Sequence, residues 1–148
     1  GCEIGNHTWD HANLAKLSME KVNMQYDKTA DLVKKLVGYD ITLLRPPYGA
    51  ISTKMRKKLK HPMALWNTDT LDWKSKNTQA IMKEIKKNVK DGDIILMHDI
   101  HPTTVEALKK VLPWLVKNDY DILTVSELAK RKGAVMHNGK AYGGFTGN

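Results

Sequence analysis

The sequence has 148 residues, of which 41% are hydrophobic and 27% charged. This length suits one packed core or part of one and excludes two ordinary domains, and no apolar run approaches the roughly 18 residues of a membrane span. The single cysteine, Cys2, excludes an internal disulfide. The net charge of +8 favours polyanionic partners. Only Arg45, Arg56 and Arg131 are arginines, however, which argues against a nucleic-acid reader.

Strands and helices are expected to alternate along the chain. Short apolar runs predict strands, and capping residues followed by apolar residues three and four apart predict helices. In chain order we expect a strand at 3–6, a helix at 18–38, a strand at 41–44, a brief helix from Ser52, a strand at 63–67, a polar stretch at 68–72, a helix from Asn77, a turn at 91–93, a strand at 94–97, a helix opened by a capping box at Thr103, a strand at 122–125 and a last helix from Ser126. This alternation predicts a parallel sheet covered by helices.

Polar residues that often do chemistry follow four of these strands. In parallel α/β folds such residues gather at one end of the sheet, where functional groups are usually found. They are His7 and His11, Arg45, Asp69 and Asp72, and His98.

His7 and His11 are spaced i and i+4, so both rings would face one cation if the segment curled into a helical turn. A catalytic zinc usually takes three protein ligands, so a third donor must come from elsewhere. Two ordinary surface or capping histidines are the alternative interpretation.

The segment Arg45-Pro46-Pro47-Tyr48-Gly49 predicts a rigid loop, because two prolines fix φ and the glycine permits a tight turn. A fixed Tyr48 N–H would suit an oxyanion hole, and a plain turn with a solvated arginine is the alternative.

Trp73 follows two loop carboxylates, where it could lie against a sugar ring or simply belong to the core. Leu96 and His98 alternate onto one face of their strand, so Leu96 could wall a small apolar pocket beside His98. Such a pocket would suit an acetyl methyl group, whereas a satisfied imidazole at the core edge is the alternative for His98.

Together and in this order, these segments resemble the polysaccharide deacetylase family, the NodB-homology domain of carbohydrate esterase family 4. The segments His7–His11, Arg45–Gly49, Asp69–Trp73 and Leu96–His98 match its second to fifth motifs, and Leu123–Leu128 matches its usual close. The whole is most similar to Gram-positive peptidoglycan N-acetylglucosamine deacetylases. The resemblance implies a distorted (β/α) barrel with an open groove for a linear glycan, here lacking its first strands.

The resemblance also implies a role for each residue. His7 and His11 would bind a divalent cation, usually zinc, with cobalt or manganese as alternatives. The Tyr48 N–H would hold the oxyanion and Arg45 would orient the catalytic aspartate. Asp72 would orient and charge His98, the general acid, while Trp73 and Leu96 would shape the groove and the acetate pocket.

One family motif has no counterpart in this sequence. The Thr-Phe-Asp-Asp motif, which supplies the base and the third metal ligand, is absent, and Asp10 is not assigned to either role. We therefore expect residues 1–148 to be the carboxy-terminal part of one deacetylase domain, inactive alone, with a second chain carrying the amino-terminal part. Without that partner, unpaired strand edges and apolar surface would be exposed.

The expected activity is hydrolytic deacetylation of N-acetylglucosamine in peptidoglycan, at the cell surface or outside the cell. The expected partner is a glycan polymer, with neither nucleic acid nor membrane contacted by this segment. Chitin oligomers or acetylated xylan are alternative substrates, and a non-catalytic glycan-binding fragment is an alternative of another class.

Overall fold

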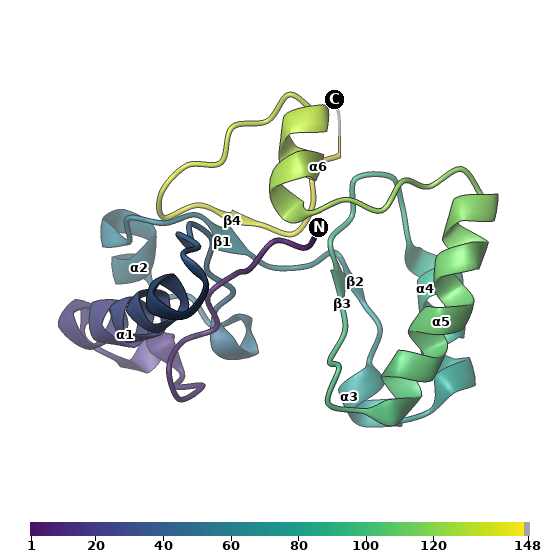
Figure 1. The fold of residues 1–148 in the computed structure, drawn as a ribbon, viewed down its shortest axis with the longest axis horizontal. Coiled ribbons are helices and arrows are strands. Elements are labelled where there is room, and N and C mark those ends of the chain that lie inside the picture. The colour runs from purple at the N-terminus through teal and green to yellow at the C-terminus, as the bar shows by residue number, and fades with distance from the viewer. Residues whose placement is uncertain (147–148) are drawn as a thin grey trace. The chain divides into compact units, whose positions relative to one another are not determined.

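A computed structural model describes residues 1–146, which fall into two compact units (Figure 1). The first unit contains residues 1–65 and 133–142, and the second contains residues 66–132 and 143–146. The elements are η1 (Leu14–Lys16), α1 (Met19–Val37), η2 (Pro47–Gly49), α2 (Thr53–Lys58), β1 (Met63–Ala64), β2 (Thr68–Asp69), α3 (Asp72–Ser75), α4 (Thr78–Asn88), β3 (Ile95–Leu96), α5 (Pro102–Lys117), α6 (Val125–Arg131) and β4 (Ala141–Tyr142). None of the helices within residues 1–146 has the length and apolar character needed to cross a bilayer.

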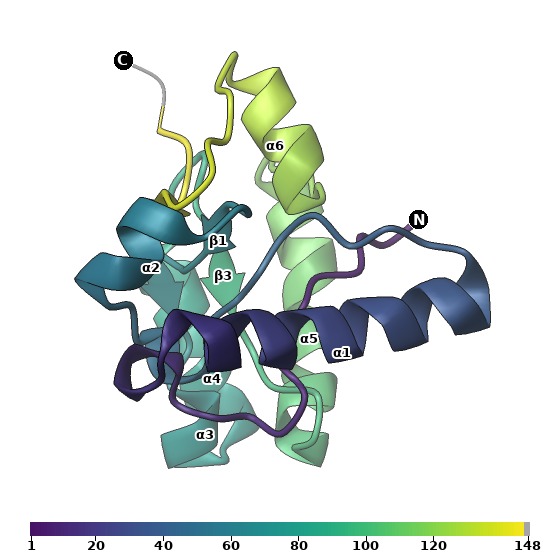
Figure 2. The same ribbon diagram turned by 90° about the vertical axis from the view of Figure 1, so that its left-hand side faces the viewer.

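In the first unit, α1 packs its apolar face on a short parallel sheet. Figure 2 shows this helix side-on. Single bridges join Asn6 to Leu44 and Leu44 to Met63, and β1 continues the parallel pairing to β4. Val22 and Tyr26 of α1 are buried in the same cluster as Leu44 and Met63. This packing fixes the loops that follow Asn6 and Leu44, where the first group of candidate residues lies.

In the second unit, β2 and β3 pair in parallel, with Thr68 opposite Ile95. Helices α4 and α5 pack on each other around Ile81, Ile85 and Val111, which are buried completely or almost so. The second group of candidate residues follows β2 and β3, as the strand-end argument predicts.

The helix caps carry the clearest agreement with the sequence. Ser18, Ser52 and Asn77 each accept a backbone N–H at the start of α1, α2 and α4, and Gly38 ends α1 with a φ of +70°. The predicted mixture of helices and strands and the parallel strand pairing are confirmed, whereas the strict alternation is not, because α1 and α2, and likewise α5 and α6, follow each other without a strand between them.

The strands are shorter than expected, and β2 lies directly after the range 63–67 in which a strand was expected. The runs at 3–6 and 41–44 contribute only bridges through Asn6 and Leu44. β2 falls on Thr68–Asp69, inside the stretch expected to be polar loop. Thr68 can be a buried strand residue because its hydroxyl donates to Asp93 Oδ2 (2.8 Å).

The prediction of a capping box at Thr103 was wrong. Helix α5 begins at Pro102 with His101 as its N-cap, because the fixed φ of proline suits the first helical position. Thr103 is thereby inside the helix, and the hydroxyl of Thr104 donates to Asp72.

The strand predicted at 122–125 was also wrong, since no strand forms there and Ile122 is half exposed. The last helix begins at Val125, with Thr124 and Glu127 forming its capping box. The short helix α3 and strand β4 were not expected, because four-residue and two-residue elements carry too little periodicity to detect.

Candidate active site

The segment from His7 to His11 brings its two imidazoles together without forming a helix. Thr8 and His11 have φ values of 70° and 62°, so the chain makes a tight left-handed turn instead of the helical turn considered above. The two ring centroids lie 4.9 Å apart, edge to face. The spacing thus predicted the juxtaposition but not the backbone that achieves it.

Buried polar side chains hold this turn in place. The amide of Asn6, which is fully buried, donates to the Tyr26 carbonyl (2.9 Å) and accepts from the Thr8 N–H (2.8 Å). The Thr8 hydroxyl in turn accepts from the His11 N–H (3.0 Å). These bonds hold the backbone in a left-handed conformation that residues other than glycine rarely adopt.

Helix α1 supplies a second anchor through Gln25, which is 6% exposed. Its Oε1 accepts the backbone N–H groups of Trp9 (2.9 Å) and Asp10 (3.2 Å). A side chain of α1 therefore provides the hydrogen-bond acceptor for two backbone N–H groups of the turn. Lys28, also on α1, places its ammonium 4.0 Å from the centre of the Trp9 ring.

The tautomer of His7 is set by the loop after Leu44. His7 Nδ1 lies 2.5 Å from the Arg45 carbonyl oxygen, which can only accept a hydrogen bond. Nδ1 therefore carries a proton, and in the neutral ring the lone pair is on Nε2, as in metal-ligating histidines.

This geometry fits a divalent cation held by two imidazoles. Within residues 1–146, no cluster of three or more His, Cys, Asp or Glu side chains completes a ligand set. The two imidazoles alone are fewer than the three protein ligands that a catalytic zinc usually takes.

Tyr48 adopts a left-handed conformation (φ 62°) in the loop after Pro46 and Pro47. No backbone or side-chain acceptor within the described residues receives its N–H. Its ring lies against the His11 ring (centroids 4.8 Å apart) and is 70% exposed. The rigid loop predicted from the prolines thus presents a fixed donor beside the imidazole pair.

Asp72 is the centre of the second group of residues. Its side chain is fully buried at the start of α3. Oδ1 accepts from His98 Nδ1 (2.8 Å) and the Trp73 N–H (2.8 Å), and Oδ2 accepts from the His98 N–H (2.5 Å) and the Thr104 hydroxyl (2.9 Å). Two bonds to each oxygen make this the most heavily coordinated carboxylate described here.

The electrostatics of Asp72 follow from those bonds. Burial raises the pKa of this carboxyl, but the hydrogen bonds from His98 and Thr104 outweigh burial and leave the pKa below its ordinary value. The carboxylate is consequently ionised at neutral pH, and it holds Nδ1 of His98 as a donor. His98 Nε2 is then the ring atom able to exchange a proton with a substrate.

The remaining predicted residues of this group are close to the pair in the sequence. Trp73 is 51% exposed, so it is a surface aromatic and not a core residue. Leu96 is 5% exposed, and its carbonyl accepts from the Thr70 hydroxyl (2.8 Å). Asp69 uses Oδ1 to accept the Leu71 N–H (2.9 Å).

Each unit thus gathers its own predicted residues. The first unit brings together His7, His11, the Arg45 carbonyl and Tyr48. The second unit brings together Asp72 and His98, with Trp73 beside them. Asn6, Gln25 and Thr104, which position these groups, were missed. All three lay in segments expected to form a strand or a helix, at 3–6, at 18–38 and from Thr103, but none of the three side chains was expected to position a site residue.

Comparison with known proteins connects these groups to a family. Residues 1–63 match the sequence profile described as polysaccharide deacetylase. The chain is 39% identical over 132 residues to the peptidoglycan-N-acetylmuramic acid deacetylase PdaC of Bacillus subtilis, covering 89% of this chain and 28% of that protein. It is 38% identical over 142 residues to the peptidoglycan-N-acetylglucosamine deacetylase PgdA of Listeria monocytogenes, covering 96% of this chain and 30% of that protein.

A solved structure is similar over nearly the whole chain. The structure described as T48 deacetylase with substrate superposes with a TM-score of 0.89 at 35% identity, over 95% of this chain and 69% of that chain. The predicted α/β fold of this type is confirmed by that likeness. The chain spans less than a third of the length of the two curated relatives.

Proposed function

Because this chain belongs to the polysaccharide deacetylase family, we propose that it is part of an enzyme that hydrolyses the acetamide of N-acetylglucosamine units in peptidoglycan. The products would be acetate and a free amino sugar. The observation that carries the proposal is the imidazole pair, in which His7 has the tautomer of a metal ligand. A cell-surface or extracellular location follows from that substrate.

His7 and His11 would hold a divalent cation, zinc or alternatively cobalt or manganese. When bound, the cation supplies Lewis-acid polarisation of the acetamide carbonyl and activation of water. A further ligand and the catalytic base would come from the amino-terminal part of the domain on a second chain, with Arg45 orienting that base.

The other residues of the chain would act on the substrate directly. The Tyr48 N–H would donate to the carbonyl oxygen as negative charge develops there, which is typically worth about 3 to 4 kcal/mol. His98 would donate a proton to the departing amine, while Asp72 holds the other ring nitrogen. Trp73 would face a sugar ring and Leu96 would wall the space for the acetyl methyl group.

The test is release of acetate by the intact protein, with zinc added, from peptidoglycan, chitin oligomers and acetylated xylan. Mass spectrometry of the digested peptidoglycan would assign the free amine to glucosamine or to muramic acid. Free glucosamine units from peptidoglycan are the expected result. If only xylan or only chitin released acetate, that polymer and not peptidoglycan would be the substrate. Binding without acetate release would favour a glycan-binding role.

A further inference from the structure

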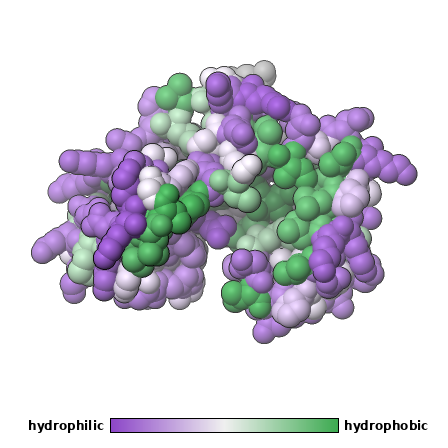
Figure 3. Space-filling model, viewed as in Figure 1, coloured by the Kyte–Doolittle hydropathy of each residue, from purple (hydrophilic) through white to green (hydrophobic). Residues whose placement is uncertain are grey.

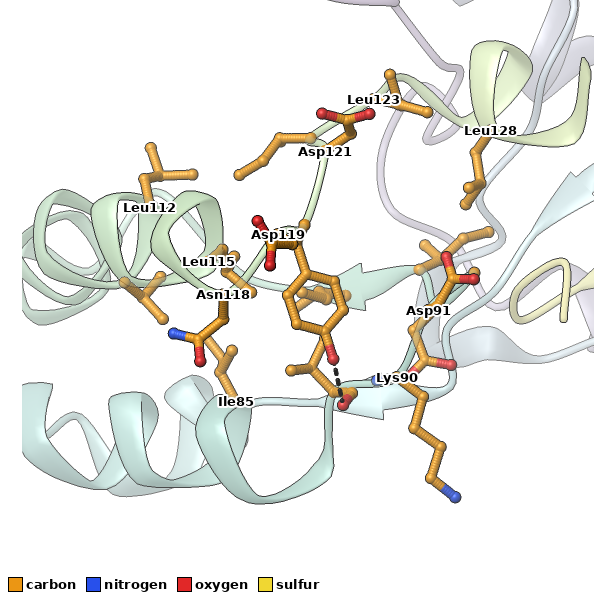
Figure 4. A pocket seen from close by; sticks show the side chains of 18 of the residues that line it. Ile85, Lys90, Asp91, Leu112, Leu115, Asn118, Asp119, Asp121, Leu123 and Leu128 are labelled. Atoms are coloured by element: carbon orange, nitrogen blue, oxygen red, sulfur yellow. Dashed lines mark hydrogen bonds between the residues drawn. The ribbon is translucent and has the colours of Figure 1, made fainter. Parts of the chain in front are cut away.

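Hydrophobic side chains gather in the second unit around a groove of about 590 Å³ between α5 and the segment leading into α6 (Figure 3). Figure 4 shows Leu112, Leu115 and Leu128 among the residues of its wall. The residues that line this groove include neither Asp72 nor His98. These apolar side chains are therefore not part of the candidate site.

The exposed aromatic ring of Tyr48, in the first unit, has a different setting. It is 70% exposed and lies outside the buried core cluster of that unit. It nevertheless lies edge to face with the His11 ring, with centroids 4.8 Å apart and planes inclined by 73°. This is a favourable arrangement of two aromatic rings. The contact of the Tyr48 ring is thus with a candidate metal ligand and not with the core.

The backbone of the loop places the Tyr48 ring on His11. Tyr48 has a φ of 62°, a left-handed value that side chains larger than glycine rarely adopt. The loop holds this value through Pro46, whose φ is −63°, and through the Gly49 N–H, which donates to the Pro46 carbonyl (3.0 Å). Such a conformation persists only where its surroundings determine it fully. The direction of the ring is therefore set by the rigid turn that also presents the Tyr48 N–H.

The two imidazoles of the first unit differ in how they are held. The His7 ring is fixed by the hydrogen bond to the Arg45 carbonyl. The ring nitrogens of His11 make no hydrogen bond within residues 1–146, where only its backbone N–H donates, to Thr8. Its ring instead contacts the rings of His7 and Tyr48. A metal-ligating histidine is usually oriented by a hydrogen bond to its other nitrogen, so ring packing takes that place here.

We propose that the aromatic ring of Tyr48 is a positioning group, which holds the His11 imidazole in the orientation that lets it share one cation with His7. The inference rests on the proposed function, in which the two histidines hold the cation. It gives the Tyr48 side chain a role separate from that of the Tyr48 N–H. A ring that is already oriented loses less conformational freedom when it binds, so its affinity is higher.

Two substitutions separate the ring from the rest of the side chain. Tyr48→Phe keeps the ring and removes only the hydroxyl. Tyr48→Leu removes the ring but keeps an apolar side chain, for which the left-handed backbone is as unfavourable as it is for tyrosine. Tyr48→Asn is a second variant without the ring, and asparagine tolerates this backbone better, so the test remains if the leucine variant does not fold.

The first measurement is the mobility of the His11 ring in the intact protein without metal, by ¹³C relaxation of labelled histidine. In the parent and in Tyr48→Phe, the order parameter of the His11 ring should be in the rigid range, about 0.85. In Tyr48→Leu and Tyr48→Asn it should fall below about 0.6. The His7 ring is the internal control and should stay rigid in all four proteins, because the Arg45 carbonyl holds it. A rigid His11 ring in the variants without the aromatic ring would overturn the proposal.

The second measurement is the zinc dissociation constant of the intact protein, by competition with a chromophoric chelator. It should rise about five-fold in Tyr48→Leu and Tyr48→Asn and stay at the parent value in Tyr48→Phe. The melting temperature of the metal-free protein should not change, because the ring is 70% exposed. Equal zinc affinity in all variants would overturn the proposal, and so would a weakened affinity that accompanies a lower melting temperature.

The two measurements separate this inference from the proposed function. A parent protein that binds no zinc would contradict the proposed function, while the relaxation measurement would still test the contact between Tyr48 and His11. A zinc-binding parent whose His11 ring stays rigid without the Tyr48 ring would contradict this inference alone.

Discussion

The two units hold a histidine ring in different ways. His7 is fixed by a backbone carbonyl, which is neutral and does not titrate, and His98 is fixed by a buried carboxylate, which is charged. A neutral acceptor suits a ring that keeps one lone pair for a cation, whereas an anionic acceptor can hold a ring while a proton passes through it. The two histidines thus suit different chemistry, because Nδ1 faces a carbonyl oxygen in His7 and a carboxylate oxygen in His98.

Replacing each histidine by alanine should have the largest effects and tests the different roles of the two rings. In the intact enzyme, His98→Ala should lower kcat by about 10²- to 10⁴-fold while the zinc content stays unchanged. His7→Ala should lose both zinc and activity, because a ligand is removed. Metal analysis and acetate release on the same preparations check both, and full metal content in the His7 variant would contradict the role given to that ring.

Asp72→Asn tests the charged anchor through its pH dependence. The folded-state pKa of Asp72 lies below its ordinary 3.8, so its bonds stabilise the fold above that pH and lose this contribution as the pH falls through the lowered value. The variant should be less stable at pH 7 by about 3 kcal/mol. That deficit should shrink below pH 3.8. Urea unfolding at pH 7 and pH 3 measures it, and an equal deficit at both values would show that charge is not the cause.

Two neighbouring threonines sharpen the comparison further. Thr104→Val removes the hydroxyl that donates to Asp72 and should cost about 1.5 to 3 kcal/mol of unfolding free energy. Thr103→Val is the matched control, because the buried Thr103 hydroxyl has no partner within the described residues and its loss should be neutral or stabilising. Similar losses in both variants would argue against a specific bond to Asp72.

Gln25→Leu tests the neutral anchor and should have the smallest effect. Removing the acceptor for two backbone N–H groups loosens the turn between the two imidazoles, so zinc affinity should fall about ten-fold. Asn23→Leu, at an exposed position of the same helix, should leave affinity unchanged. Equal zinc dissociation constants for Gln25→Leu and the parent protein would remove Gln25 from the site.

Local features were the ones that the sequence could predict. The caps at Ser18, Ser52 and Asn77 act within a few residues, so their pattern is visible in the chain itself. The His7 and His11 spacing and the Pro46-Pro47 turn are visible for the same reason.

Contacts between distant residues were not predictable in this way. The contact of Asp72 with His98 spans 26 residues and was expected only through the family resemblance, whereas the contacts of Asp72 with Thr104, 32 residues away, and of Gln25 with the turn were not expected. The strand expected from the apolar run at 122–125 did not form, because β propensity alone does not make a strand without a neighbouring strand to pair with.

The acceptor that orients His7 belongs to the peptide unit of residue 45, which every amino acid carries. Substituting the side chain of Arg45 therefore leaves the hydrogen bond between His7 and the carbonyl of residue 45 in place. Substituting every amino acid at this position would test the role of the charged side chain alone. To disturb His7, a mutation would have to move the main chain at residue 45. Replacing Pro46 or Pro47 would do so, because their rings fix φ in the loop that follows. Tolerance at position 45 would thus be compatible with an indispensable loop.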